Sequence, residues 1–165
     1  MFIAEPGYEL IVRDYSQIEL RLLAVVSEDP VLMDEYKRGV DVHMNNAELI
    51  AKTLGINWAK LTDAEKKTYR TQSKSTLGFG VIYGMGSRSL SEQLGVPEDV
   101  AEMLIITIFA KYKGVDRWIK RAKQSGVKTG YSKTPFGRKR DIPNVFSKDK
   151  GKLMYGLRQI INSVI

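Results

Sequence analysis

The first residue with a clear chemical use is an aspartate between two elements of different type. Asp14 follows Tyr8–Arg13, whose short β-branched centre predicts a strand, and it precedes Ser16, a good N-cap for a helix. A carboxylate at such a strand end suits Mg2+, which prefers one or two carboxylates together with water and phosphate oxygens. The position therefore indicates either a magnesium site for phosphoryl transfer or simply a helix cap.

A second group of residues combines two cations with two aromatic rings. Arg70 and Lys74 are four residues apart, as are Phe79 and Tyr83, so each pair shares one face of a predicted helix. Glycines interrupt that helix at a cost of roughly 1 kcal/mol each relative to alanine, which marks a close approach to the backbone. By spacing alone, the pattern is also that of a solvated basic face followed by a core aromatic pair.

The octapeptide around Asp14 carries a distinctive resemblance. Residues 14–21, DYSQIELR, match without a substitution motif A of the family A DNA polymerases, the DNA polymerase I family. The resemblance implies that Asp14 binds the catalytic Mg2+ ions and that the backbone carbonyl of Tyr15 completes their coordination. It further implies that Gln17 lies at the nucleotide site and that Glu19 disfavours a ribose 2′-hydroxyl. This steric gate speaks against the related single-subunit RNA polymerases.

The histidine of the chain lies in a shorter block of the same kind. Asp41-Val42-His43, followed by Ala47, resembles the block that comes next in the family. The resemblance implies that His43 lies near the incoming triphosphate. A lone histidine on a helix also has an ordinary structural interpretation.

The segment that carries the cation and aromatic pairs resembles motif B, the fingers helix of the family. The resemblance implies that Arg70 and Lys74 neutralise the triphosphate, that Phe79 stacks on the incoming base, and that Tyr83 closes over the templating position. These four residues complete the predicted nucleotide site.

The spacing inside motif B departs from the family. Lys74 lies five residues before Phe79, whereas the family has four. One extra residue turns the basic pair by about 100° around a regular helix and shifts it by about 1.5 Å. Either a π-bulge near Gly78 absorbs the difference or the long basic side chains reach around the helix.

Two further blocks predict contacts with DNA. Gly130-Tyr131 followed by Thr134 to Arg140 resembles a family segment in which two arginines contact the phosphate backbone, here Arg138 and Arg140. Such contacts supply affinity without sequence specificity. A solvated basic turn is the alternative.

The last block is similar to the family segment near the primer terminus. Arg158 and Asn162 match it, whereas Leu157 replaces the usual glutamate. The alternative is an ordinary helix with two polar surface residues.

These residues need a mixed α/β scaffold that is mainly α. The resemblance implies a partial polymerase palm with few strands and a helical fingers insertion: palm with motif A at 1–40, fingers with motif B at 41–126, and a return to the palm at 127–165. The local patterns predict three helices by their start alone: one after Ser16, one after Asp29 and one from a capping box at Thr62. They predict further helices at Val42–Leu54, Ser89–Leu94, Glu98–Lys111, Val115–Lys123 and about Asp149–Asn162, and a strand and turn at Val127–Thr134.

Composition favours a nucleic-acid partner and excludes several classes of site. The 165 residues contain 26 Lys and Arg against 19 Asp and Glu, a net charge of +7 that is concentrated in the last third of the chain. The absence of cysteine excludes disulfides and thiolate zinc sites. We find no basic leader before an apolar core and no apolar run of spanning length, so we expect a cytoplasmic protein without membrane contact.

The sequence ends at Ile165, before the position where the family carries motif C and its second set of carboxylates. Two-metal phosphoryl transfer needs carboxylates on both sides of the ion pair. We therefore expect half of a two-Mg2+ site, with primer–template DNA and deoxynucleoside triphosphates as partners and a complementing polymerase fragment that supplies motif C. The alternatives are an inactive truncated product and a non-catalytic DNA- or nucleotide-binding module.

Overall fold

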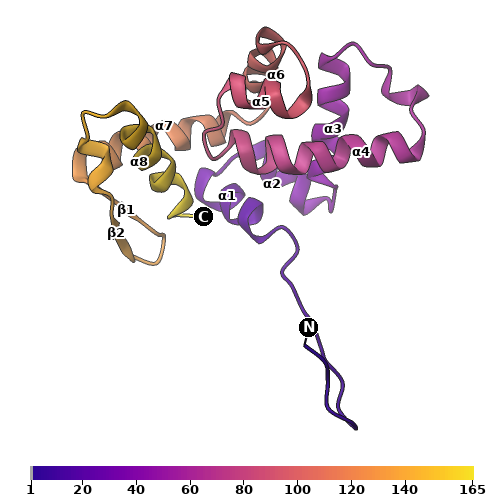
Figure 1. Cartoon of the computed structure of the whole chain (residues 1–165), viewed down its shortest axis with the longest axis horizontal. Coiled ribbons are helices and arrows are strands. Elements are labelled where there is room, and N and C mark those ends of the chain that lie inside the picture. The colour runs from indigo at the N-terminus through magenta and orange to yellow at the C-terminus, as the bar shows by residue number, and fades with distance from the viewer. Residues whose placement is uncertain (1) are drawn as a thin grey trace.

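A computed structural model of the protein describes residues 2–165, apart from the side chains of residues 77–79. Helices dominate, and the strands form one small antiparallel hairpin (Figure 1). The elements in chain order are α1 Ile18–Ser27, α2 Pro30–Lys37, α3 Val42–Thr53, η1 Trp58–Lys60, α4 Asp63–Ser73, the π-helix η2 Lys74–Val81, α5 Ser87–Leu94, α6 Glu98–Lys111, α7 Lys113–Thr129, β1 Tyr131–Lys133, β2 Lys139–Asp141, η3 Pro143–Phe146 and α8 Lys150–Asn162.

One apolar core joins these helices. α1 and α2 lie at the centre of the molecule, α3 to α6 lie on one side of them, and the hairpin and α8 lie on the other, with α7 running between the two sides (Figure 1). Side chains that are almost fully buried come from all of these parts, which is the pattern expected of a single cooperative core. They include Leu23, Ile50, Leu90, Leu104, Ile108, Val115, Ile142, Ile160 and Ile161.

Most helix boundaries follow the local sequence signals. Asp29 caps α2 with Pro30 at its first position, and Thr62 forms a capping box with Glu65 at the start of α4. α6 has the predicted bounds, and α8 begins after its predicted cap Asp149. The fold class is therefore confirmed as mixed α/β and mainly α.

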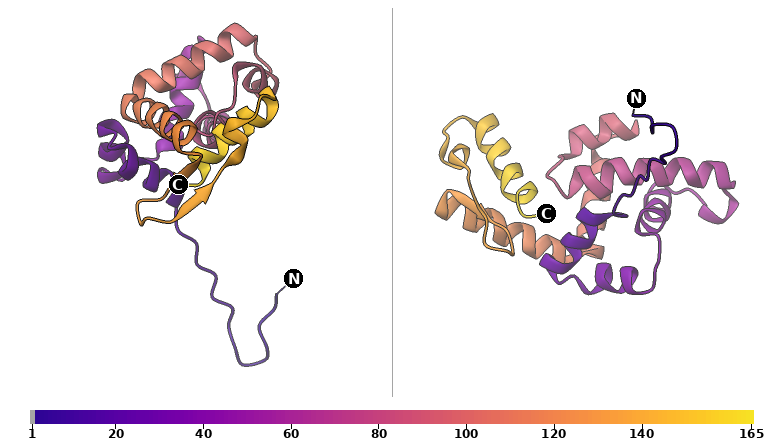
Figure 2. Two further views of the ribbon diagram at one scale, coloured as in Figure 1. Left: turned by 90° about the vertical axis from the view of Figure 1, so that its left-hand side faces the viewer. Right: turned by 90° about the horizontal axis from the view of Figure 1, so that it is seen from below.

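The predicted strand Tyr8–Arg13 does not form. Residues 2–13 extend away from the body as an arm without regular structure (Figure 2). Leu10, Ile11 and Val12 are 59–81% exposed, and the arm's backbone hydrogen bond joins the Tyr8 amide to the Glu5 carbonyl. A β-branched run forms a strand only when a neighbouring strand accepts and donates its backbone hydrogen bonds. No described segment lies beside Tyr8–Arg13 to do so.

The helix of motif A begins two residues after the predicted cap. α1 starts at Ile18, and Gln17 before it adopts a left-handed conformation with φ 54°. That turn separates Ser16 from the helix, so the Ser16 side chain does not cap it. The expectation of a serine cap is therefore wrong.

The strand and turn predicted at Val127–Thr134 form only in the second half of that range, because its first three residues are helical. α7 continues to Thr129 and ends at Gly130, whose φ of +77° stops the helix. Only Tyr131–Lys133 is extended, and it pairs with Lys139–Asp141 across the turn at Pro135–Gly137. A Cβ on Gly126, in this last part of α7, would collide with Ile160 of α8, so the two helices pack closely at this point.

None of the described helices has the length and apolar character needed to cross a bilayer.

Candidate functional site

An open cavity of about 200 Å³ collects most of the predicted nucleotide site. Its lining comes from three separate parts of the chain: the turn into α1, the start of α3 and the start of η2. The lining residues are Asp14, Tyr15, Gln17, Ile18, Glu19, Leu20, His43 and Lys74. The fold thus brings together residues that are up to 60 positions apart in the sequence.

Two side chains hold the left-handed turn at Gln17 in place. The Tyr36 hydroxyl donates a hydrogen bond of 3.0 Å to Gln17 Oε1. The Arg21 guanidinium lies 4.8 Å from the centre of the Tyr36 ring, and its Nε donates to the Ser16 carbonyl at 3.0 Å. Burial raises the pKa of Tyr36 to about 12, although the Arg21 charge opposes the shift, so this hydroxyl stays a donor at neutral pH. α2 therefore fixes the turn that carries Asp14 and Tyr15.

Glu19 is held by the aromatic residue of the second motif. The Tyr83 hydroxyl donates to Glu19 Oε2 at 2.9 Å, which joins α1 to the segment after η2. Burial, reinforced by the Glu19 carboxylate, raises the pKa of Tyr83. The hydrogen bond fixes one carboxylate oxygen of Glu19 at the wall of the cavity.

Asp41 connects α3 to α4. Its Oδ1 accepts from the amides of His43 and Met44 and caps α3, and its Oδ2 accepts from Arg70 Nε at 2.7 Å. Burial opposes ionisation of Asp41. The hydrogen bonds from Arg70 and from the two amides outweigh that effect and hold the pKa of the carboxyl below its ordinary value. Arg70 is thereby directed toward α3, beside the histidine.

His43 is almost fully buried, with 2% of its surface exposed. Burial lowers its pKa, and the Arg70 and Lys74 charges lower it further, against the opposite effect of Asp41. The imidazole is therefore neutral at pH 7. Its Nδ1 is buried without a hydrogen-bond partner among the described residues. An unsatisfied ring nitrogen at a cavity wall is unusual in an ordinary structural histidine.

The extra residue of motif B lies in a π-helix. η2 spans Lys74–Val81 and widens the helix directly after α4. Such a segment accommodates one additional residue without displacing the helix on either side. The expected π-bulge near Gly78 is therefore confirmed, and Lys74 lines the cavity. The side chain of Phe79 lies outside the described residues, so its predicted stacking role stays a prediction.

Arg158 approaches the end of motif B from α8. A Cβ on Gly84, whose φ is +92°, would lie 3.3 Å from Cγ of Arg158. Glycine therefore leaves room for the arginine stem at this point. Arg158 and Asn162 are both exposed on α8.

The predicted backbone-binding arginines lie in a different place. Arg138 and Arg140 line an open hollow of about 400 Å³ with Thr134, Lys139 and Ser163. Arg140 Nη1 donates to Ser163 Oγ at 3.0 Å, which joins the hairpin to the end of α8. No residue of this hollow lines the nucleotide cavity. The predicted site residues therefore form two groups.

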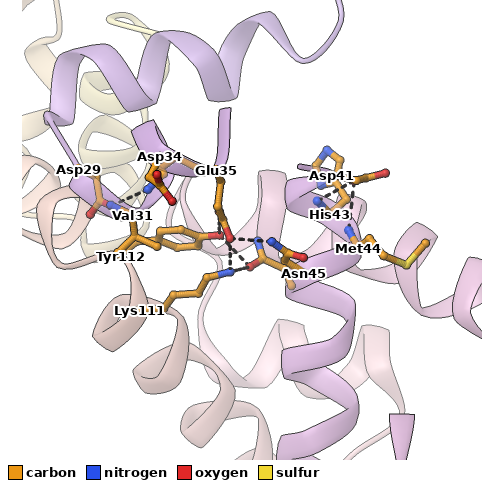
Figure 3. A network of polar contacts seen from close by, with 12 residues as sticks. Asp29, Val31, Asp34, Glu35, Asp41, His43, Met44, Asn45, Lys111 and Tyr112 are labelled. Carbon is orange, nitrogen blue, oxygen red and sulfur yellow. Dashed lines mark hydrogen bonds and ion pairs between the residues drawn. The ribbon is translucent and has the colours of Figure 1, made fainter. Parts of the chain in front are cut away.

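A buried polar network holds the helices around the first group. Figure 3 shows Glu35 of α2 facing Tyr112 and Lys111, at the junction of α6 and α7. Glu35 accepts from the Tyr112 hydroxyl at 2.8 Å, from Asn45 Nδ2 at 2.9 Å, and pairs with Lys111 at 3.0 Å. Breaking such a buried pair leaves an uncompensated charge, so the network fixes α2 and α3 against α6.

Asp29 serves two helices at once. Its Oδ1 accepts from the amides of Val31 and Leu32 at the start of α2. Its Oδ2 accepts from the amides of Gly114 at 2.6 Å and Val115 at 3.2 Å, at the start of α7. One fully buried carboxylate therefore satisfies four backbone donors and joins the two helix ends.

The carboxylates fit Mg2+ only in part. Asp14 is exposed at the cavity and makes no described hydrogen bond through its side chain, whereas Glu19 is engaged by Tyr83. Within residues 2–165 as described, no three metal-binding side chains cluster together. The magnesium site predicted at Asp14 and the Tyr15 carbonyl would therefore require further oxygen ligands from outside this group.

The sequence did not predict the hydrogen bond of Tyr36 to Gln17 or the ion pair of Asp41 with Arg70. Both contacts join elements across the fold, from Tyr36 to Gln17 and from Asp41 to Arg70. The capping function of Asp41 has a local signal, but no local spacing connects it to Arg70, 29 residues later.

Comparison with known proteins shows the family to which the chain belongs. The family model described as DNA polymerase family A matches residues 1–165. The chain is 40% identical to DNA polymerase I of Deinococcus radiodurans over 149 residues, which cover 90% of this chain and 15% of that protein. It is 33% identical to DNA polymerase I of Pseudomonas aeruginosa over 162 residues, covering 98% of this chain and 17% of that protein.

A solved structure has the same fold. It is the POL domain of Pol1 from M. smegmatis in complex with DNA primer–template and dNTP, with a TM-score of 0.77 and 26% identity. The match covers 91% of this chain and 25% of the other. The chain thus spans less than a fifth of the two full-length relatives named above. On this sequence and structural similarity, the chain belongs to DNA polymerase family A.

Proposed function

We propose that this chain supplies the motif A and motif B side of a site for template-directed DNA synthesis, with nucleotidyl transfer to a primer 3′-hydroxyl. The observation that carries the proposal is the convergence of Asp14, Glu19, His43 and Lys74 on one cavity. Membership of DNA polymerase family A and the likeness to a polymerase bound to primer–template and dNTP support it. In this proposal residues 1–40 and 127–165 belong to the palm and 41–126 to the fingers.

The cavity residues have distinct roles in this proposal. Lys74 neutralises the triphosphate, and the neutral imidazole of His43 offers a hydrogen bond at the same wall. Arg70 does not line the cavity and pairs with Asp41, so it joins the triphosphate only after leaving that carboxylate. Glu19, held by Tyr83, stands where a ribose 2′-hydroxyl would be excluded. Asp14 and the Tyr15 carbonyl hold Mg2+, which when bound polarises phosphate oxygens and lowers the pKa of the 3′-hydroxyl.

The second group of residues positions the DNA. Arg138 and Arg140 contact phosphates of the template or primer, and Arg158 and Asn162 lie near the primer terminus. Arginine–phosphate contacts fix the register of a duplex without reading its sequence. A general DNA polymerase requires such contacts, because it must bind DNA of any sequence.

Nucleotide binding tests the first group directly. A deoxynucleoside triphosphate is titrated into the chain in Mg2+ and the dissociation constant is measured by calorimetry. Lys74→Gln should weaken binding about tenfold or more, because a charge-assisted contact is lost. Lys67→Gln, an exposed lysine on α4, is the matched control and should leave binding unchanged. Equal losses in the two variants would remove the support for Lys74 as a triphosphate ligand.

Primer extension tests whether the centre is incomplete. Because the described residues hold no cluster of three metal-binding side chains, we propose that the chain alone does not extend a primer with Mg2+ and all four deoxynucleotides, and that a polypeptide supplying the carboxylates of motif C restores extension. Asp14→Ala controls for a contaminating polymerase. Extension by the chain alone that Asp14→Ala abolishes would contradict the proposed incompleteness. Nucleotide binding without extension under any condition would favour a non-catalytic binding module instead.

A further inference from the structure

The outer face of α7 is strongly basic. Lys113, Arg117, Lys120, Arg121 and Lys128 are all exposed, and at about 100° per residue they fall within roughly 100° of the helix circumference. The opposite face carries the buried side chains that contact the core. Over the roughly 22 Å from the first cation to the last, the face is long enough to align several phosphates of one strand.

Most of this charge is not neutralised within the described residues. Asp116 is the only acid of α7, and it pairs with Lys120 at 2.7 Å. The other four cations make no ion pair in the described part of the chain. Close cations without counter-charges repel one another, so the face favours a polyanion.

Two open hollows border this face and share one residue. The first, of about 500 Å³, lies between the end of α1 and α7 and is lined by Ser27, Glu28, Arg117, Lys120 and Arg121. Its three cations outnumber the single acid, Glu28. The second, of about 290 Å³, lies between α7, β1 and α8 and is also lined by Arg121. Arg121 therefore connects the two hollows into one track.

The second hollow adds groups that suit a single strand. The half-buried Tyr131 provides an aromatic ring, which the Lys139 ammonium contacts at 4.8 Å from its centre. Lys133 adds a further cation, whereas Trp118 is 9% exposed and belongs to the core. Ser132 lines the hollow and is 6% exposed, and its hydroxyl is buried without a hydrogen-bond partner among the described residues. An aromatic surface next to a positive groove is the common arrangement of sequence-tolerant single-strand binders.

We propose that α7 and these two hollows form a second DNA-binding track, which holds the backbone of a single strand. The track shares no lining residue with the hollow of Arg138 and Arg140 or with the nucleotide cavity. It therefore adds a contact beyond the proposed primer–template site. The cations bind phosphates in sequence along α7, and the Ser132 hydroxyl donates to a phosphate or sugar oxygen in the second hollow.

Binding of a labelled oligothymidylate to the full chain tests the proposal. Fluorescence anisotropy is measured across a range of salt concentrations, without Mg2+ or nucleotide, so that the result does not depend on the polymerase site. Arg117→Gln/Arg121→Gln/Lys128→Gln is compared with Lys37→Gln/Lys60→Gln/Lys67→Gln. The control removes the same charge from exposed lysines that make no described ion pair.

The α7 variant should bind at least about tenfold more weakly than the control variant. The plot of log affinity against log salt concentration should become less steep, its slope decreasing in magnitude by about 2. Each lost phosphate contact with a single strand removes about 0.7 from that magnitude, and the variant loses three cations. Equal losses in both variants would overturn the proposal, since only net charge would then matter. An equal loss of blunt-duplex binding in the α7 variant would overturn the assignment to a single strand.

Ser132→Ala tests the second hollow separately. It should weaken single-strand binding several-fold while leaving the urea midpoint of unfolding unchanged or higher, because the removed hydroxyl has no described partner. Unchanged binding would exclude this hollow from the track. Both binding measurements are made without nucleotide and Mg2+, so they do not depend on primer extension. Failure of this track and failure of the proposed polymerase site therefore remain distinguishable.

Discussion

His43 shows how one buried side chain makes stability depend on pH. Its pKa in the folded protein lies below the ordinary 6.5, because burial and the nearby cations disfavour the imidazolium. The unfolded chain therefore binds a proton first as the pH falls. The stability contributed by the neutral ring is present above pH 6.5 and is lost progressively as the pH falls from there toward the folded-state pKa.

We expect the free energy of unfolding to fall by about 1 kcal/mol for each pH unit below 6.5, as long as the folded ring stays neutral. His43→Gln should remove most of this slope. Urea unfolding of both proteins between about pH 7.5 and 5.5 measures the difference. Asp41, whose folded pKa is lowered, affects stability only at more acidic pH. Parallel slopes in the two proteins would mean that His43 does not titrate as described.

At the scale of elements, the π-helix accommodates the extra residue of motif B. Deleting Ser75 should return η2 to α-helical geometry and restore the four-residue spacing between Lys74 and Phe79. Because the π-helix accommodates the extra residue without displacing the helix on either side, Lys74 should stay at the cavity, and affinity for a deoxynucleoside triphosphate should change by less than about threefold. Ser75→Ala keeps the length and is the control. A loss of about tenfold after the deletion but not after Ser75→Ala would show that the π-helix, rather than a regular helix, is needed to place Lys74.

A second prediction at this scale concerns the shared cap Asp29. Asp29→Ala removes the acceptor for four backbone amides and should lower the free energy of unfolding by about 2–4 kcal/mol. Asp149→Ala, which removes the exposed cap of α8, should cost only about 1 kcal/mol. Urea unfolding measures both. Similar losses would contradict the double role of Asp29.

The sequence predicted the elements whose signals are local and missed those that depend on a distant neighbour. The cap Asp29, the capping box at Thr62 and the π-helix have such local signals, and the structure confirms them, whereas the left-handed turn at Gln17 removes the predicted Ser16 cap. The strand expected at Tyr8–Arg13 needs a partner strand, and the last part of α7 packs against Ile160 of another helix. The same holds at the site: the motifs identified the cavity residues, whereas Tyr36 and the Asp41–Arg70 pair required the fold.

At the scale of the whole molecule, the N-terminal arm is set apart from the core. It has little backbone hydrogen bonding, and its large apolar side chains are exposed. Exposed segments without tertiary contacts are cleaved first by proteases. Arg13 is the only lysine or arginine among residues 2–16.

Brief digestion with trypsin should therefore cut first after Arg13 and leave residues 14–165 intact. Mass spectrometry of a time course identifies the first product. Arg21 should resist, because it lies in α1 and its side chain is bound to Ser16 and Tyr36. A first cut within the helical body would mean that the arm is protected by contacts that its exposure does not indicate.

The double cap at Asp29 has a mechanical consequence. Because one buried carboxylate holds the first turns of both α2 and α7, these two helices cannot change their mutual angle without breaking hydrogen bonds at one end or the other. They form a rigid base beneath the turn that carries Asp14. In the proposed polymerase we therefore expect closure over a bound substrate to take place by movement of α4 and η2 against this base, with rearrangement of the half-buried contact of Arg70 with Asp41.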